Sequence, residues 1–157
     1  MRYRLAAVSV VIVSSLIALS ASWAQMSGHR MITASDLKWD DVPSLPAGAK
    51  IAVIEGPMNE AVPFTIRLKF PANYSIPAHS HPAVERVTVL SGTFHMGTGD
   101  KLDSQRTMPV SPGDMMIMQP QTNHFGWTKE EVVVQLSGTG PWGVTYVDPA
   151  DDPRKKK

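Results

Sequence analysis

The chain has 157 residues, the size of one domain with short terminal extensions. Hydrophobic residues make up 43% and charged residues 18%, a balance that excludes a disordered or strongly charged protein. The net charge of +1 excludes the global basic field of nucleic-acid-binding proteins, and the lack of cysteine excludes disulfides, thiolate metal sites and a catalytic thiol.

Residues 1–24 predict a signal peptide that is not part of the fold. Two arginines precede an apolar run over residues 5–19, and Ala24 ends a pattern of small residues before a cut at Gln25. The run is short for a membrane span, which needs about 20 residues, so an uncleaved anchor is the less favoured alternative. We expect a periplasmic or secreted mature protein, with no membrane attachment after cleavage.

Residues 25–49 predict an N-terminal arm. This stretch contains Trp39, Pro43 and Pro46 and has little helical or strand periodicity. One alternative role for the arm is strand addition to the sheet edge of a second copy, which would make a homodimer.

Short β-type runs separated by turn residues follow the arm. Residues 64–70 alternate strictly between apolar and polar side chains, as a half-buried strand does. Ser91-Gly92 lies between two such runs and predicts a two-residue hairpin. The other expected strands are 51–54, 84–90, 93–96, 115–118, 125–128, 132–137 and 143–147. So many short strands predict an all-β sandwich or barrel over residues 50–148.

Residues 149–157 predict a basic C-terminal tail. The segment ends in Arg154 and three lysines. We expect it to be solvated, with charges that add no more than a weak attraction to an anionic surface.

Two histidines and a carboxylate have the spacing of a metal site. His79 and His81 are two residues apart and Glu85 keeps the same parity, so the three side chains would project from one face of an extended chain. Imidazole and carboxylate groups suit Mn, Fe, Co, Ni, Cu and Zn. A fourth ligand must come from elsewhere, and His124 is the candidate.

This spacing resembles the first motif of the cupin superfamily. The motif joins a glycine, two histidines, a glutamate and a second glycine, and here it contains Asn73, His79, His81, Glu85 and Gly92. Only the opening glycine differs, and Asn is the next most tolerant residue of a left-handed backbone.

The second cupin motif is matched less closely. Gly113 and His124 keep the spacing of the motif, whereas Pro120 lies one place late and Thr128 replaces a final Asn. The resemblance covers roughly residues 51–147. It is closest to small, exported, single-domain bacterial cupins that carry a Gly-Pro-Trp-Gly segment near the C-terminus.

The resemblance implies a double-stranded β-helix, the jelly-roll barrel of RmlC-like cupins, with a metal in one mouth. One divalent transition metal (Fe, Mn, Ni, Cu, Co or Zn) would be bound by His79, His81, Glu85 and His124. Such a set commonly leaves one to three open positions for water, O₂ or a bidentate oxygen substrate.

Two functions remain open. The first is a metalloenzyme acting on a small oxygenated molecule, with dioxygenase-like oxidation ahead of lyase or isomerase chemistry, and with Glu85 as a ligand that also acts as a catalytic base. The second is a non-catalytic exported cupin that holds or senses a metal or small ligand. In both cases the partner is a small molecule, with a homodimer as a further option and no nucleic acid. An open coordination position would distinguish the two functions.

Other side chains invite functional roles that we set aside. The predicted hairpin turns His95 away from the metal face and places Phe94 and Met96 on it. Arg67 and Lys69 are expected on a solvated outer face rather than beside an anionic substrate.

The methionines and two aromatic residues are also open to two interpretations. The four clustered methionines predict core packing, with thioether ligation of Cu(I) as the alternative. They are Met108, Met115, Met116 and Met118. Phe125 and Trp127 either line an apolar pocket or belong to the ordinary barrel core.

Overall fold

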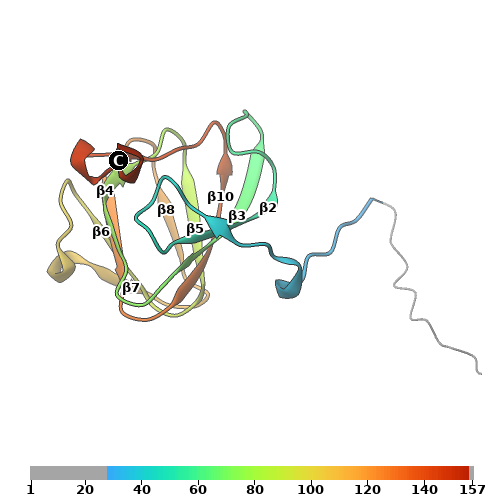
Figure 1. The fold of residues 1–157 in the computed structure, drawn as a ribbon, viewed down its shortest axis with the longest axis horizontal. Coiled ribbons are helices and arrows are strands. Elements are labelled where there is room, and N and C mark those ends of the chain that lie inside the picture. The colour runs from blue at the N-terminus through green and yellow to red at the C-terminus, as the bar shows by residue number, and fades with distance from the viewer. Residues whose placement is uncertain (1–27, 156–157) are drawn as a thin grey trace, which may run out of the picture. The chain divides into compact units, whose positions relative to one another are not determined.

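Two antiparallel β-sheets make up the fold of residues 28–155, the part of the chain that this computed structural model describes (Figure 1). The predicted signal peptide, residues 1–24, lies outside the described residues. Within them, no helix has the length and apolar character needed to cross a membrane. All of the strands belong to a unit that begins at Ile32, and the all-β prediction is confirmed.

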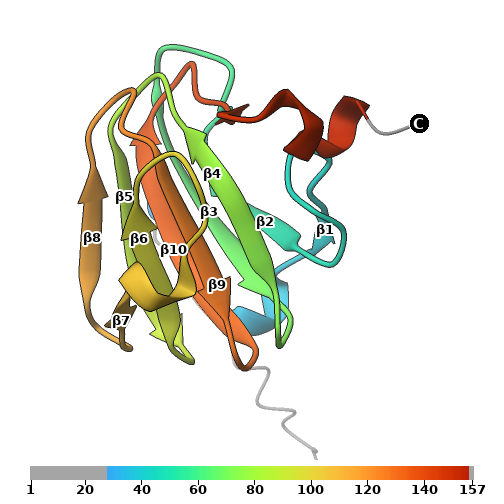
Figure 2. The same ribbon diagram turned by 90° about the vertical axis from the view of Figure 1, so that its left-hand side faces the viewer.

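The strands form two layers, which Figure 2 shows lying face to face. The larger sheet has six strands in the order β1 (Asp40–Asp41), β2 (Lys50–Glu55), β3 (Pro63–Phe70), β10 (Val132–Thr139), β5 (Glu85–Ser91) and β8 (Met115–Met118). The smaller sheet has five, in the order β11 (Thr145–Tyr146), β4 (Ser75–Ser80), β9 (His124–Thr128), β6 (Phe94–Thr98) and β7 (Met108–Val110). The described chain also has 3₁₀ helices η1 (Ala34–Asp36), η2 (Ser104–Arg106), η3 (Pro149–Asp151) and η4 (Pro153–Lys155). From β4 onward the chain passes repeatedly between the sheets, as in a jelly roll.

The core lies between the two layers and follows from the alternation of side chains. In β3 every second residue is apolar, and Phe64, Ile66, Leu68 and Phe70 are all buried. β10 pairs with β3 in a continuous antiparallel register and adds its own buried aliphatic side chains. Each large apolar side chain buried in this way contributes about 1.5–3 kcal/mol.

The hairpin predicted at Ser91-Gly92 is wrong. β5 pairs with β10 and β8, whereas β6 pairs with β9 and β7, so the chain crosses from one sheet to the other at this point. Gly92 has a φ of 72°, and a Cβ there would lie 2.4 Å from the carbonyl oxygen of Glu131. The glycine therefore allows a tight crossing between the two sheets. A Ser-Gly dipeptide is compatible with such a crossing and with a hairpin, so the sequence alone does not distinguish them.

The arm expected over residues 25–49 contacts the domain from Trp39 onward. β1 pairs with β2, Leu45 is buried, and the carbonyl of Ser44 accepts a hydrogen bond of 2.9 Å from the hydroxyl of Tyr146. This part of the arm therefore packs on its own barrel.

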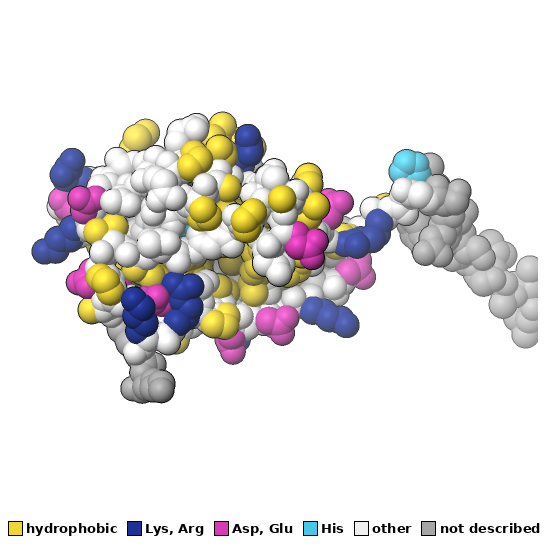
Figure 3. All heavy atoms as spheres, turned by 90° about the horizontal axis from the view of Figure 1, so that it is seen from above, with side chains coloured by type: hydrophobic (Ala, Val, Ile, Leu, Met, Phe, Trp, Pro, Cys, Tyr) yellow, Lys and Arg dark blue, Asp and Glu magenta, His cyan; other side chains and the backbone are white. Residues whose placement is uncertain are grey.

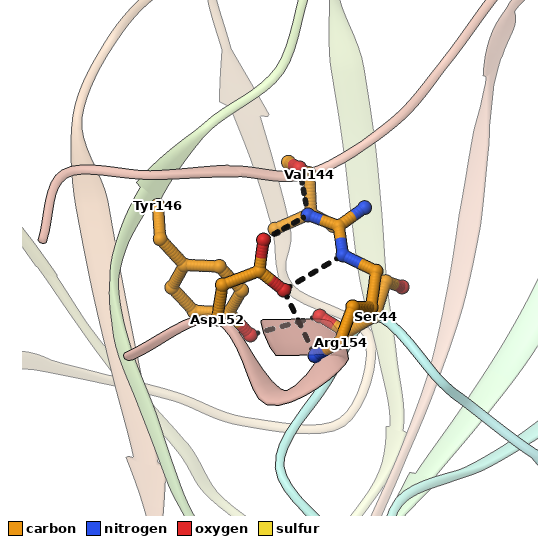
Figure 4. Close-up of polar contacts among 5 residues, drawn as sticks. All are labelled: Ser44, Val144, Tyr146, Asp152 and Arg154. Atoms are coloured by element: carbon orange, nitrogen blue, oxygen red, sulfur yellow. Dashed lines mark hydrogen bonds and ion pairs between the residues drawn. The ribbon is translucent and has the colours of Figure 1, made fainter. Parts of the chain in front are cut away.

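The C-terminal segment, expected to be a solvated tail, is ordered through residue 155 as η3 and η4, and most of it is exposed, but Asp152 packs against the domain. Asp152 is only 7% exposed, and its two carboxylate oxygens accept hydrogen bonds of 2.7 and 2.9 Å from Nε and Nη2 of Arg154. Nη2 of Arg154 also donates to the carbonyl of Val144 at 2.9 Å (Figure 4). The hydrogen bonds from Arg154 hold the pKa of Asp152 below its ordinary value. We call Asp152, Arg154 and the Val144 carbonyl the C-terminal clasp.

Candidate metal centre

Three histidines converge between the two sheets. His79 lies in β4, His81 directly follows β4, and His124 begins β9, where it is the register partner of His79. All three side chains are buried, and one ring nitrogen from each lies within 4.8 Å of the others. The structure therefore brings together the three histidines that the sequence singled out.

Glu85 reaches the same place from the opposite sheet. Its expected position on the histidine strand is wrong, because β4 ends at Ser80 and Glu85 begins β5 in the larger sheet. Its Oε2 nevertheless lies 3.3 Å from Nε2 of His81 and 3.5 Å from Nε2 of His124, and the residue is buried. The sequence therefore predicted correctly that Glu85 lies near the histidines. The reason differs, because Glu85 approaches them from the opposite sheet and not along the same strand.

Backbone carbonyls fix the orientation of the three histidines of the centre. The three Nδ1 atoms lie at hydrogen-bond distance from carbonyl oxygens: His79 from Pro77 at 2.7 Å, His81 from Gly143 at 2.7 Å, and His124 from Thr122 at 2.9 Å. A carbonyl can only accept, so each Nδ1 carries the hydrogen. In a neutral ring, Nε2 is then left with its lone pair, which is the arrangement of a metal-bound histidine.

The centre holds a buried negative charge that needs a positive partner. Burial by itself raises the pKa of Glu85, but the contacts with His124 and His81 outweigh burial and lower the pKa to about 2. The carboxyl group is therefore ionised. His79 contributes no charge, because burial, followed by the charges of His124 and His81, lowers its pKa to about 3.

Positive charge beside Glu85 must come from protons on His81 and His124 or from a metal ion. Nε2 of His81 is buried without a hydrogen-bond partner among the described residues. A buried polar atom in this state is costly. One divalent cation would satisfy the three Nε2 atoms and the carboxylate together, so the residues present fit a transition metal.

The centre opens into a small apolar pocket. Its free volume is about 40 Å³, roughly the space of an ion with one or two waters. The walls include Phe94, Met96 and Phe125, and Trp142, whose ring stacks on His81 with centroids 4.4 Å apart. On the face seen from above in Figure 3, charged side chains lie mainly around the margin, with hydrophobic and uncharged groups between them.

Two residues at this centre escaped the sequence analysis. Gly143 supplies the carbonyl for His81, and Trp142 covers the ring of that histidine. In the sequence, their Gly-Pro-Trp-Gly segment indicates only a resemblance to small bacterial cupins. The signal lay in a tryptophan beside a glycine, but the contact of this segment with His81 depends on folding across 62 positions.

His95 faces away from the centre, as predicted, although the hairpin behind that prediction does not exist. Its ring stacks on Trp127 with centroids 4.0 Å apart, because β6 and β9 place these residues opposite each other. Arg67 contacts Gln135, and the Lys69 ammonium lies 4.5 Å from the ring centroid of Trp39. Neither cation lines the metal pocket.

The methionine cluster divides between the core and the surface. Met118 is buried and Met116 partly buried, as core packing predicts, but Met108 and Met115 are 74% and 58% exposed.

The two aromatic residues after His124 differ in burial. Phe125 is buried and is among the residues that line the pocket, whereas Trp127 is partly exposed and its indole nitrogen donates to Thr107.

Comparison with known proteins gives the same architecture. The family model described as "ChrR Cupin-like domain" matches residues 27–141. The polyketide cyclase RemF from Streptomyces resistomycificus is similar with a TM-score of 0.66 and 20% identity, over 81% of this chain and 91% of that one. A sugar phosphate isomerase of the cupin superfamily from Silicibacter pomeroyi DSS-3 has a TM-score of 0.60 and 14% identity, over 74% and 81%.

An RmlC-like cupin from Shewanella frigidimarina NCIMB 400 has a TM-score of 0.57 and 14% identity, over 71% of this chain and 90% of that one. No curated protein matches the chain. At identities of 14–20%, these structural similarities show the fold and do not show the chemistry.

Proposed function

The chain belongs to the ChrR cupin-like family, and from this premise we propose that it is a metal-dependent enzyme acting on a small oxygenated molecule. One observation carries the proposal: three buried imidazoles, each held by a backbone carbonyl, converge at one point, and two of them contact a buried carboxylate. One divalent cation would balance the carboxylate and give the buried Nε2 of His81 a partner.

His79, His81 and His124 would hold the ion through Nε2, and Glu85 would complete the set. When bound, a divalent metal supplies Lewis-acid chemistry to a substrate oxygen at its open positions. The carbonyls that bind the Nδ1 atoms keep the three rings from rotating, so the histidines form the fixed part of the site.

Glu85 would be the mobile part. It comes from the opposite sheet, and its described side-chain contacts are with the rings of His81 and His124. Because β5 lies in the larger sheet, a rotation of the Glu85 side chain would move its carboxylate without moving β4 or β9. Its pKa of about 2 suits a ligand better than a strong base, so a catalytic proton transfer would need a substrate proton that is already acidic.

We place oxidation by O₂ first among the reaction classes. The support is the small apolar pocket, which admits a diatomic molecule and limits water around the centre. Elimination or isomerisation would use the same residues. The cyclase and isomerase among the structural neighbours illustrate that this fold also carries non-oxidative chemistry.

The small free volume also favours a second candidate function, a cupin that holds or senses a metal without catalysis. A pocket of about 40 Å³ suits a nearly closed coordination shell. The two functions differ in whether a ligand can reach the metal.

Metal analysis of protein purified from its native compartment tests the proposal. We expect about one divalent transition metal per chain. After loading with Fe(II) or Co(II), addition of pyruvate should shift the absorption spectrum if the metal has open positions. A loaded protein whose spectrum pyruvate leaves unchanged would be a holder, and protein that binds no metal would contradict both functions.

We also propose that the protein is exported and begins at Gln25. The support is the charged, apolar and small-residue pattern of residues 1–24. Mass analysis of the N-terminus of the native protein tests this, and a chain that keeps its first 24 residues would contradict it.

A further inference from the structure

A second apolar compartment adjoins the metal centre. It has a free volume of about 180 Å³, and part of its wall comes from the loop over residues 42–45. Four residues line both this compartment and the pocket at the histidines: Leu45, Leu68, Trp142 and Val144. The two spaces therefore adjoin each other across these shared side chains. We call the second space the side compartment.

The chemistry of the side compartment is apolar. None of the described residues that line it carries a charge. A cavity of about 150 Å³ lined by apolar side chains stays dry and binds benzene. The side compartment is slightly larger, so it has room for one six-membered ring or a short branched chain.

Trp142 adds a polar group at the boundary between the two spaces. Its Nε1 is buried without a hydrogen-bond partner among the described residues. The ring is held on one side by His81, with centroids 4.4 Å apart, and by Phe64 at 5.8 Å. An N–H group that is buried and unsatisfied is costly, and an acceptor oxygen on a bound ligand would relieve that cost.

We propose that the ligand of this site is a small amphipathic oxo or carboxylic acid whose apolar group is no larger than one benzene ring. Its oxygen-bearing head lies at the histidines and accepts a hydrogen bond from Nε1 of Trp142, while its apolar group fills the side compartment. This inference rests on the proposed function, because the head uses the open positions of the metal.

Two probes with the same head and different tails test the proposal. Pyruvate and phenylpyruvate are titrated into Fe(II)- or Co(II)-loaded protein without O₂, and the spectral shift gives each dissociation constant. Phenylpyruvate should bind at least about tenfold more tightly, because its ring leaves water for the side compartment.

Two variants with matched controls locate the effect. Val42→Phe fills the side compartment from a residue that does not line the metal pocket, so it should abolish the advantage of phenylpyruvate and leave pyruvate unchanged. Val53→Phe makes the same chemical change at a side chain that is 59% exposed and should alter neither constant.

The second variant, Trp142→Phe, keeps an aromatic ring and removes the N–H. It should weaken both acids by about two- to tenfold, the range of one hydrogen bond. Trp127→Phe is its control, because the indole of Trp127 already donates to Thr107 and lies away from the pocket.

The outcomes separate this inference from the function beneath it. Equal affinity for the two acids, or a Val42→Phe variant that still prefers phenylpyruvate, overturns the side compartment as a ligand site and leaves the metal site intact. A Trp142→Phe variant that binds both acids as well as the parent overturns the hydrogen bond to the head. Metal-loaded protein that binds neither acid overturns the open coordination position, and the inference fails with it.

Discussion

Two histidine–tryptophan pairs lie in this barrel, one inside and one outside. Inside, His81 stacks on Trp142 at 4.4 Å, and both Nε2 of the imidazole and Nε1 of the indole are buried without hydrogen-bond partners in the described structure. Outside, His95 stacks on Trp127 at 4.0 Å, and the indole donates to Thr107. The residue types and the stacking are alike, so ring contact alone does not identify a functional histidine.

The difference lies in what surrounds each pair. Nδ1 of His81 contacts the carbonyl oxygen of Gly143, and Nε2 of the same ring lies beside the carboxylate of Glu85. His95 has neither among its described contacts. A functional histidine is distinguished here by an oriented ring whose free nitrogen faces a buried charge.

Removing the histidine of each pair in turn should give the largest difference in metal binding. His81→Ala removes one metal ligand and should lower metal affinity by well over 100-fold, because loss of a ligand should exceed the roughly 10- to 100-fold effect of losing an outer contact. His95→Ala should leave the metal content near one per chain. Metal analysis after dialysis measures both, and circular dichroism checks that each variant keeps its β structure. Loss of metal from the His95 variant alone would show that the wrong histidine has been assigned.

Glu85→Gln tests the carboxylate that distinguishes the inner pair. Three imidazoles remain, so metal affinity should fall by roughly 10- to 100-fold rather than vanish. Turnover of any substrate should be lost, since the negative charge is gone. Competition against a chromophoric chelator measures the affinity, with Glu130→Gln as an exposed control. An unchanged affinity would remove Glu85 from the ligand set.

The C-terminal clasp should have a smaller effect on the inner pair. Arg154 holds the carbonyl of Val144, next to Gly143, so Asp152→Asn should loosen the carbonyl that orients His81. We expect metal affinity to fall by about tenfold, the lower end of the range for outer contacts. Asp41→Asn breaks the exposed ion pair with Lys50 and should change nothing. Equal affinities for the two variants would limit the clasp to a structural role.

The smallest expected effect is on stability at alkaline pH. Burial, followed by the charge of Asp152, raises the pKa of Tyr146 to about 12. The ordinary pKa is about 10 in the unfolded chain, so the contribution of this phenol to stability is present below pH 10 and is lost between pH 10 and 12. Tyr146→Phe should weaken that dependence and cost about 0.5–1.5 kcal/mol at neutral pH through its bond to Ser44. Chemical denaturation at pH 8 and pH 11 measures both effects.

Local signals predicted the all-β fold and the shared face of His79 and His81, whereas the arrival of His124 was implied by the resemblance to the second cupin motif. Strand alternation fixes which residues of β3 are buried, and the spacing of His79 and His81 survives any arrangement of the sheets. The crossing at Gly92 and the arrival of Glu85 from the opposite sheet depend on which strands pair, and strand pairing leaves little trace in neighbouring residues. For the same reason, the contacts of Trp142 with His81 and of Arg154 with Val144 required the folded structure.

The position of the C-terminal clasp in the chain also determines when the site can be completed. During synthesis, His79, His81 and His124 emerge before Gly143, and Arg154 emerges 30 residues after the last of these histidines. A metal that meets the partly made chain would find its ligands present but the ring of His81 unsupported. Tight capture would therefore follow the docking of the C-terminal segment, so the identity of the bound metal would be decided wherever the whole chain first folds.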